Sequence, residues 1–484
     1  MGMIEPKSRH ILMTFLGGLI LATSGPASRA DGPAASPFWV GTGSCAAAAC
    51  HGGRREPLGL KGSEYGFSGA YDPHTRAFSV LYDDRSKVIE RNYRQLHPRP
   101  EPRAIDDDRD DSQPFKDDLC LRCHVHQGYD SRDVRARSVE FTEADGVGCE
   151  GCHGPAGRWL VPHTEYGWKG LSDQQKEVVF GLRPTKDLLA RGKMCAECHV
   201  GDGPTDVNHD LIAAGHPRLN FEYGSQLAKL PKHWRIGDDK VRVPDYEAKV
   251  WALGRLIAAK ASLDLLESRA LRATREEAPW PEFAEYSCFS CHHNLVEKSW
   301  RQVSLTPGAR PGSLPWGTWY LPASKGLTLG SEGLEIEGPG SPIGPLREIM
   351  AGPAPDPRVV ARRAHAASDA IARLAERVNR DRIPSSQVRA NLANVFDDIA
   401  DGPLDWDRAA QKYLAIIALD RSLGESNPGY TGLPVRAGLD RLRQHLDLPR
   451  QDEEGKGVFD SPNRYNPGLI QGDLQAIRSA LPNP

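Results

Sequence analysis

Methionine is almost absent from this chain, which has five among 484 residues against sixteen histidines. Three of the five (Met1, Met3 and Met13) lie close to the N-terminus, so only Met194 and Met350 remain in the rest of the chain. The net charge is also small, at −3, and gives no electrostatic case for binding nucleic acid or an anionic membrane surface. After residue 30 no apolar run approaches the ~20 residues of a transmembrane helix, so no transmembrane span is predicted there.

Cysteine is absent outside five short motifs, which together use all ten cysteines. The motifs are Cys45-Ala-Ala-Ala-Ala-Cys50-His51, Cys120-Leu-Arg-Cys123-His124, Cys149-Glu-Gly-Cys152-His153, Cys195-Ala-Glu-Cys198-His199 and Cys288-Phe-Ser-Cys291-His292. In a Cys-x-x-Cys-His motif the two thiols add across the vinyl groups of a porphyrin, and the histidine binds its iron. The sequence therefore predicts five covalently bound c-type haems, with the ten cysteines as attachment points and the five motif histidines as proximal iron ligands.

The first motif differs from the others because four residues, not two, separate its cysteines. A plain disulfide between Cys45 and Cys50 is the alternative interpretation. His51 follows Cys50 directly, and four standard motifs lie downstream, so a haem site is favoured.

The N-terminus predicts export. Lys7, Arg9 and His10 form a basic region, and residues 11–21 are apolar. The small residues Ser28 and Ala30 fit cleavage before Asp31. Residues 1–30 are therefore predicted to be a secretory signal peptide, with an uncleaved anchor as the alternative. Export to the periplasm or an equivalent compartment also suits covalent haem attachment, which takes place outside the bacterial cytoplasm.

The predicted fold is mainly α-helical with much irregular structure, in a multihaem cytochrome c architecture whose core is packed with haem. Residues 31–300 hold all five motifs and are predicted to form the pentahaem domain, with one long helix at 246–272. Residues 301–345 are rich in Gly and Pro and predict an irregular linker with a short hairpin near 327–336. Helical periodicity at 360–378, 413–419 and 433–447 predicts a helical C-terminal region, 346–484, of unassigned role.

The sixth ligand of each iron is predicted to be a second histidine. Met194 adjoins its own motif and Met350 lies far from all of them, which nearly excludes methionine ligation. Methionine ligation raises the reduction potential, so its absence favours low-potential haems. Eight histidines are candidates for at most five places: His74, His97, His126, His163, His209, His216, His233 and His293.

The motifs resemble those of the cytochrome c554-like multihaem cytochromes (cytochrome c-552/4 type), whose haem packing is shared with hydroxylamine oxidoreductase and pentahaem nitrite reductase. The resemblance covers roughly residues 40–300. It rests on the first motif with its long spacer, Asp72-Pro-His74, Val147-Gly-Cys149 to Gly154-Pro155 with His163 downstream, and Ala214-Gly-His216-Pro-Arg-Leu219. The last motif, with its double histidine, is similar to that of exported pentahaem cytochromes from planctomycete-type bacteria.

This resemblance implies that His74, His163 and His216 are distal iron ligands, with His209 and His293 as weaker candidates. The chain departs from pentahaem nitrite reductase in lacking a Cys-x-x-Cys-Lys motif. That departure weakens any direct transfer of catalytic activity.

Two functions remain open at this point. Irons with two axial histidines have no position for a substrate, which favours an electron carrier between redox partner proteins. An enzyme with one open iron, acting on hydroxylamine, nitrite or a related small nitrogen or sulfur species, is the alternative. The acidic run at 106–111 is either a solvated loop or a docking patch for a basic redox partner.

Overall fold

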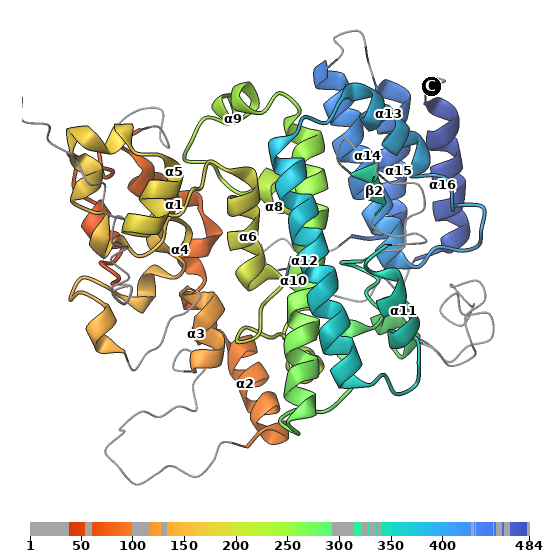
Figure 1. Ribbon diagram of the computed structural model, residues 1–484, viewed down its shortest axis with the longest axis horizontal. Helices are drawn as coiled ribbons and strands as arrows, with labels where there is room; N and C mark the ends of the chain where they lie inside the picture. Colours follow the sequence, from red (N-terminus) through yellow and green to blue (C-terminus); the bar gives the residue numbers. More distant parts are fainter. Residues whose placement is uncertain are drawn as a thin grey trace, which may run out of the picture. The chain divides into compact units, whose positions relative to one another are not determined.

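The fold is mainly helical, as predicted, with short helices joined by irregular segments (Figure 1). It was analysed in a computed structural model that describes residues 38–53, 61–98, 117–126, 133–292, 314–321, 328–329, 334–335, 341–426, 430, 432–448, 450–451, 457–458 and 465–481. The predicted signal peptide, the acidic run and His293 lie outside these residues. Within them, no helix is long and apolar enough to cross a membrane.

The first half of the chain forms short helices with little apolar core of its own. The helices are α1 (Glu64–Tyr71), α2 (Asp84–Leu96), α3 (Asp118–His124), α4 (Cys149–His153), α5 (Asp173–Gln175), α6 (Leu188–His199), α7 (His209–Ala213), α8 (Tyr223–Lys229) and α9 (Ile236–Arg242). Among the described residues before 188, the buried apolar side chains form two small clusters, one around Leu121 and one around Ala156. Helices α3, α4 and α6 each end on the histidine of a Cys-x-x-Cys-His motif.

Two long helices form the centre of the apolar core. Helix α10 (Tyr246–Thr274) matches the predicted helix at 246–272, and α12 (Pro357–Arg380) packs along it (Figure 1). Helix α12 begins where the Asp356 carboxylate accepts hydrogen bonds from two backbone N–H groups and Pro357 occupies the first turn. Its buried positions from Val360 to Val378 follow the predicted helical spacing.

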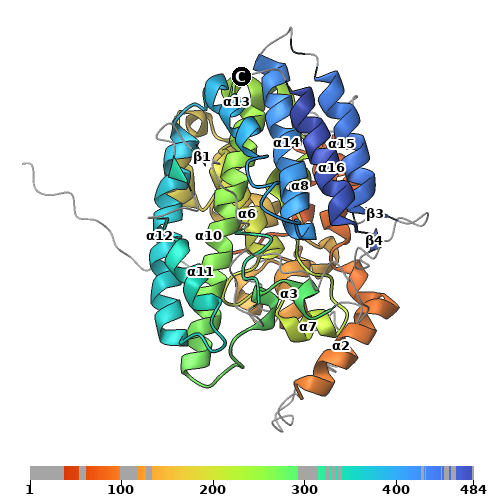
Figure 2. The ribbon, with the colours of Figure 1, turned by 90° about the vertical axis from the view of Figure 1, so that its right-hand side faces the viewer.

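The C-terminal region is helical, as predicted. It consists of α11 (Gly344–Met350), α13 (Ser385–Asn394), α14 (Trp406–Ser426), α15 (Leu433–Leu446) and α16 (Pro467–Ala480) in addition to α12. Helix α15 contacts both α14 and α16, and the three helices lie alongside one another (Figure 2). One apolar cluster extends from Leu188 to Ile477, so helices on both sides of residue 300 share a core.

In the part of the chain that the structure describes, the strands are four two-residue segments in two antiparallel hairpins. Strand β1 (Thr328–Leu329) pairs with β2 (Leu334–Glu335), within the hairpin predicted near 327–336. Strand β3 (Arg450–Gln451) pairs with β4 (Gly457–Val458).

Candidate haem-binding site

Four of the five motifs line one cavity of about 3510 Å³. A pocket for a drug-sized molecule has about 300–1,000 Å³, so this cavity has room for several large planar groups. The motif residues in its wall are Cys45, Cys50, His51, Cys120, Cys123, His124, Cys149, Cys152, His153, Cys195, Cys198 and His199. The fifth motif is not part of this wall.

Four pairs of histidine rings lie close together, and each pair contains one motif histidine. The distances between ring centroids are 6.3 Å for His51–His163, 6.0 Å for His74–His199, 6.3 Å for His153–His233 and 6.3 Å for His209–His292. A bond from a metal to an imidazole nitrogen is about 2.0–2.1 Å, so two rings on opposite sides of one ion have centroids about 6 Å apart. The four spacings therefore fit an iron held between each pair of rings.

His124 is the fifth motif histidine, and His216 lies near it. Both rings line the cavity, and they lie close enough for the charge of His124 to affect the pKa of His216. Burial is the main cause that lowers the pKa of each ring. With this pair, each of the five motif histidines has a second ring near it.

Five of these rings are held through Nδ1, which leaves Nε2 as the nitrogen available to a metal. The Nδ1 contacts are His51 with Glu64 Oε2 (3.1 Å), His74 with Asp72 Oδ1 (2.8 Å), His124 with the Ala77 carbonyl (2.6 Å), His163 with the Leu160 carbonyl (2.5 Å) and His216 with the Pro217 carbonyl (2.9 Å). Metal-binding histidines characteristically donate their other N–H to a carboxylate or a carbonyl in this way. The contacts fix the orientation of each ring and therefore fit iron ligation.

Burial keeps the buried rings neutral, which is the form that binds a metal. It lowers the pKa of His153 to about 4, with a smaller contribution from the charges of His233 and His51. It also lowers the pKa of His199 to about 4. The pKa of His233 is lowered as well, mainly by burial.

The cysteines show which motifs are neighbours. The Cys45 and Cys149 thiols of the first and third motifs lie close enough to affect each other's pKa, and so do the Cys123 and Cys198 thiols of the second and fourth. All ten cysteines, including Cys45 and Cys50, are free thiols in the structure. Burial raises the pKa of Cys152 to about 11, so this thiol is protonated at neutral pH.

The other candidate histidines have different surroundings. His97 uses Nε2 to contact Asp210 Oδ2 at 2.9 Å, and the His126 ring stacks on Trp39 with 3.6 Å between centroids. His365 and His445 in the C-terminal region contact Glu267 and Asp473. The resemblance did not single out His233, although it lies opposite His153, because the loop that carries it has no recognisable motif.

Comparison with known proteins agrees with the expected family. Residues 74–154 match the family described as cytochrome c554 and c-prime. This part of the chain is cytochrome c554-like. The matched segment contains His74 and the second and third motifs, whereas the other three motifs lie outside it. No curated protein and no solved structure matches the chain.

The C-terminal helices of this cytochrome c554-like chain help to enclose the cavity. Tyr413, Leu414, Ile417, Ala418 and Arg421 line it from one face of α14, and Asp440, Arg443 and Gln444 line it from α15. Helix α14 is also tied to the haem-motif region by Arg218, whose guanidinium makes two 3.0 Å hydrogen bonds with Asp407. These helices therefore form part of the wall of the cavity that four of the motifs line, although they contain no cysteine.

Proposed function

We propose that this cytochrome is exported and carries five covalently bound haems, low in potential and mostly bis-histidine, that relay electrons between redox partner proteins. The match to the cytochrome c554 family supports a c-type cytochrome that acts in electron transfer. The main support for bis-histidine haems is that four motif histidines each have a second histidine ring at 6.0–6.3 Å between centroids. A bound haem supplies an iron that takes up and releases one electron.

The proposed ligand pairs follow from the ring geometry. They are His51 with His163, His124 with His216, His153 with His233, His199 with His74 and His292 with His209, and the cysteines of each motif would hold the porphyrin by thioether bonds. His293, which the resemblance offered as a weaker candidate, has no place among these pairs. Two rings on every iron leave no open position for a substrate.

The partners of Nδ1 favour low reduction potentials. Glu64 and Asp72 are carboxylates in contact with His51 and His74, and a carboxylate partner makes an imidazole a stronger donor to its metal. A stronger donor stabilises the oxidised iron and lowers its potential. We therefore expect the irons of the first and fourth motifs to have potentials below those of haems with a methionine ligand.

Shared segments support close spacing of the haems. Residues 149–163 supply His153 to one proposed pair and His163 to another, and residues 209–216 supply His209 and His216 in the same way. The contacts between thiols of different motifs also bring attachment points of neighbouring haems together. Closely spaced haems allow rapid electron transfer from one to the next.

The test is a count of low-spin and high-spin irons by electron paramagnetic resonance on the purified holoprotein. We expect five low-spin centres, with five haems per chain by pyridine haemochrome assay. A high-spin centre whose signal changes with nitrite, nitric oxide or hydroxylamine would instead support an enzyme with one open iron. Fewer than five haems would contradict the proposed cofactor count.

Replacing His233 by alanine tests the ligand that the resemblance did not indicate. Because His233 is proposed to be the second ligand of the iron bound by His153, the variant should convert one of the five irons to high spin. The matched control is His126→Ala, which removes another histidine from the wall of the same cavity but should leave all five irons low-spin. Five low-spin irons in His233→Ala would remove His233 from the ligand set and leave His293 as the candidate partner of His153.

A further inference from the structure

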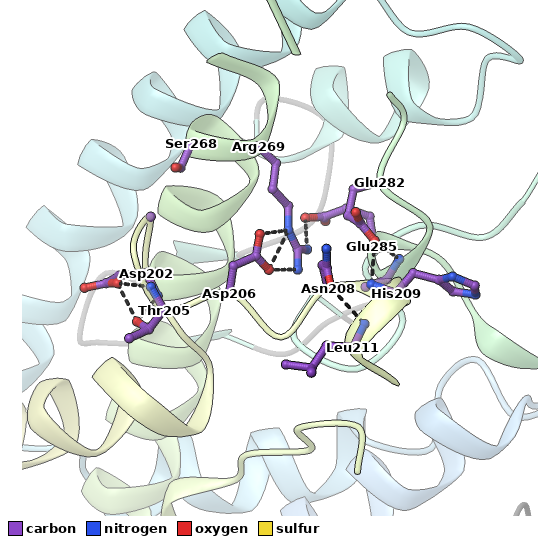
Figure 3. Close-up of polar contacts among 12 residues, drawn as sticks. Asp202, Thr205, Asp206, Asn208, His209, Leu211, Ser268, Arg269, Glu282 and Glu285 are labelled. Atoms are coloured by element: carbon purple, nitrogen blue, oxygen red, sulfur yellow. Dashed lines mark hydrogen bonds and ion pairs between the residues drawn. The ribbon is translucent and has the colours of Figure 1, made fainter. Parts of the chain in front are cut away.

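The fifth motif is held by a buried network of charged residues around Arg269 of α10 (Figure 3). Two segments bear the proposed ligands of its iron. One is the loop and helix at 202–213 with His209, and the other is the segment at 282–292 with Cys288, Cys291 and His292. Both segments reach α10 at the same point, and neither proposed ligand lines the cavity of the other four motifs.

Arg269 contacts both segments at once. Its Nη2 lies 2.6 Å from Asp206 Oδ1, three residues before His209, and its Nη1 lies 2.7 Å from Glu285 Oε1, three residues before Cys288. The side chain of Arg269 is 7 % exposed, and that of Glu285 is 8 % exposed. Arg272, one turn along α10, makes a second ion pair with Asp206, so the network contains two positive and two negative charges.

Direct contacts also join the two segments beside this network. Glu282 Oε1 accepts hydrogen bonds from the backbone N–H groups of His209 (2.8 Å) and Ala284 (3.0 Å). The Phe283 ring packs edge-on against the His209 ring, with 5.8 Å between centroids. The position of His209 therefore depends on the placement of residues 282–285, which Arg269 holds through Glu285.

His209 differs from three of the other four proposed second ligands in how its ring is held. His74, His163 and His216 each have Nδ1 within hydrogen-bond distance of an acceptor in their own segment. His209 Nδ1 lies 3.9 Å from Asp210 Oδ1, which is beyond hydrogen-bond distance. His292 is positioned by its neighbour Cys291 in the motif. His209 is therefore the less firmly positioned histidine of this pair.

We propose that Arg269 is a positioning residue for the fifth haem: by binding Asp206 and Glu285 together, it keeps His209 opposite His292 and so keeps that iron low-spin. The inference rests on the proposed function, because it requires a haem at the fifth motif with His209 as its second ligand. Arg269 is suited to this role because a guanidinium can bind two carboxylates in fixed directions, which an ammonium group cannot. Without it, two buried carboxylates would repel each other and separate the segments.

The test begins with the holoprotein and compares it with Arg269→Gln. If the unaltered protein has five low-spin irons, the variant should have four and one high-spin iron, and after reduction it should bind one carbon monoxide per chain. His209→Ala should give the same spectrum, which assigns the change to the fifth iron. Arg269→Lys, which keeps the charge but not the planar fork, should give a mixture of the two spin states.

The matched control is Arg408→Gln, which removes another partly buried ion pair, with Asp398 at 2.8 Å, from a helix that carries no proposed ligand. It should lower stability while leaving five low-spin irons. If Arg269→Gln fails to fold, the triple variant Asp206→Asn, Arg269→Met, Glu285→Gln removes every charge of the Arg269 contacts together and should still show one high-spin iron. Five low-spin irons in a folded Arg269 variant would overturn the inference, whereas fewer than five in the unaltered protein would overturn the proposed function itself.

Discussion

Alanine in place of His163 should convert the iron of the first motif from low spin to high spin, so that one of the five low-spin signals disappears. The His163 and His51 rings are nearly parallel, at 14°, with 6.3 Å between their centroids. The Leu160 carbonyl orients the His163 ring through Nδ1, and Trp159 packs edge-on against it at 5.5 Å. Alanine has no donor atom, so the iron would keep only His51. Electron paramagnetic resonance and carbon monoxide binding after reduction would measure the change.

A methionine at the same position provides the control. In His163→Met a thioether can replace the lost imidazole, and because methionine ligation raises the reduction potential, one haem should remain low-spin but titrate at a higher potential. This pair of variants separates loss of a ligand from loss of packing against Trp159. An unchanged spectrum in His163→Ala would exclude His163 as a ligand and would remove the proposed link between neighbouring haems through residues 149–163.

The proximal half of the proposed site could be inferred from the sequence because each motif is a short local pattern. Each motif fixes its own cysteines and histidine within a few neighbouring residues, and α3, α4 and α6 then place the histidine at the end of a helical turn. The second rings come from distant parts of the chain, and only tertiary structure brings them opposite the motifs. His74, His163 and His216 could be named because they resemble positions in a known family. His233 could not, since nothing in its own loop distinguishes it from a surface histidine.

For the fold, likewise, single helices could be predicted from the sequence, but the packing of one helix against another could not. The period of apolar residues predicted α10 and α12. Helix α12 buries one stripe from Val360 to Val378, whereas α10 buries residues on all its faces between Tyr246 and Ala259. The period did not predict that they pack along each other, or that α14 and α15 line the haem cavity. Other contacts between distant segments are ion pairs of single residues, such as Asp407 with Arg218 and Asp206 with Arg269. The sequence alone does not show which arginine each of these carboxylates contacts, so their structural role follows only from the folded structure.

The largest loss of stability is expected for Asp407→Ala, which would leave the guanidinium of Arg218 without its carboxylate. The Asp407 side chain is 1 % exposed and makes two 3.0 Å hydrogen bonds with Arg218. It also accepts a hydrogen bond from the Thr318 hydroxyl. Removing one partner of a buried ion pair typically costs about 3–5 kcal/mol of the free energy of unfolding. Chemical denaturation of the holoprotein, followed by far-ultraviolet circular dichroism at pH 7, would measure this loss.

Asp405 affects the size of the stability loss expected for Asp407→Ala. Burial and then the charge of Asp407 raise the pKa of Asp405 to about 6, so Asp405 is mostly ionised at pH 7 and is repelled by its neighbour. The pKa of Asp405 is higher in the folded chain than in the unfolded chain, so the folded chain holds this proton more tightly. Asp405 therefore lowers the free energy of unfolding progressively as the pH rises from the pKa of the unfolded chain towards 6. Removing Asp407 relieves part of this repulsion, which favours a loss near about 3 kcal/mol.

The surface variant Asp369→Ala is the control, because this carboxylate is 58 % exposed and its removal should change stability by less than about 0.5 kcal/mol. Asp407→Asn keeps the shape of the side chain and one acceptor oxygen, so it should lose less stability than the alanine variant. The Arg218 contact joins α14 to the segment that carries His216, so loss of the pair should also increase proteolysis within residues 406–426. A loss in Asp407→Ala no larger than in Asp369→Ala would mean that the contact does not hold the C-terminal helices against the haem-binding region.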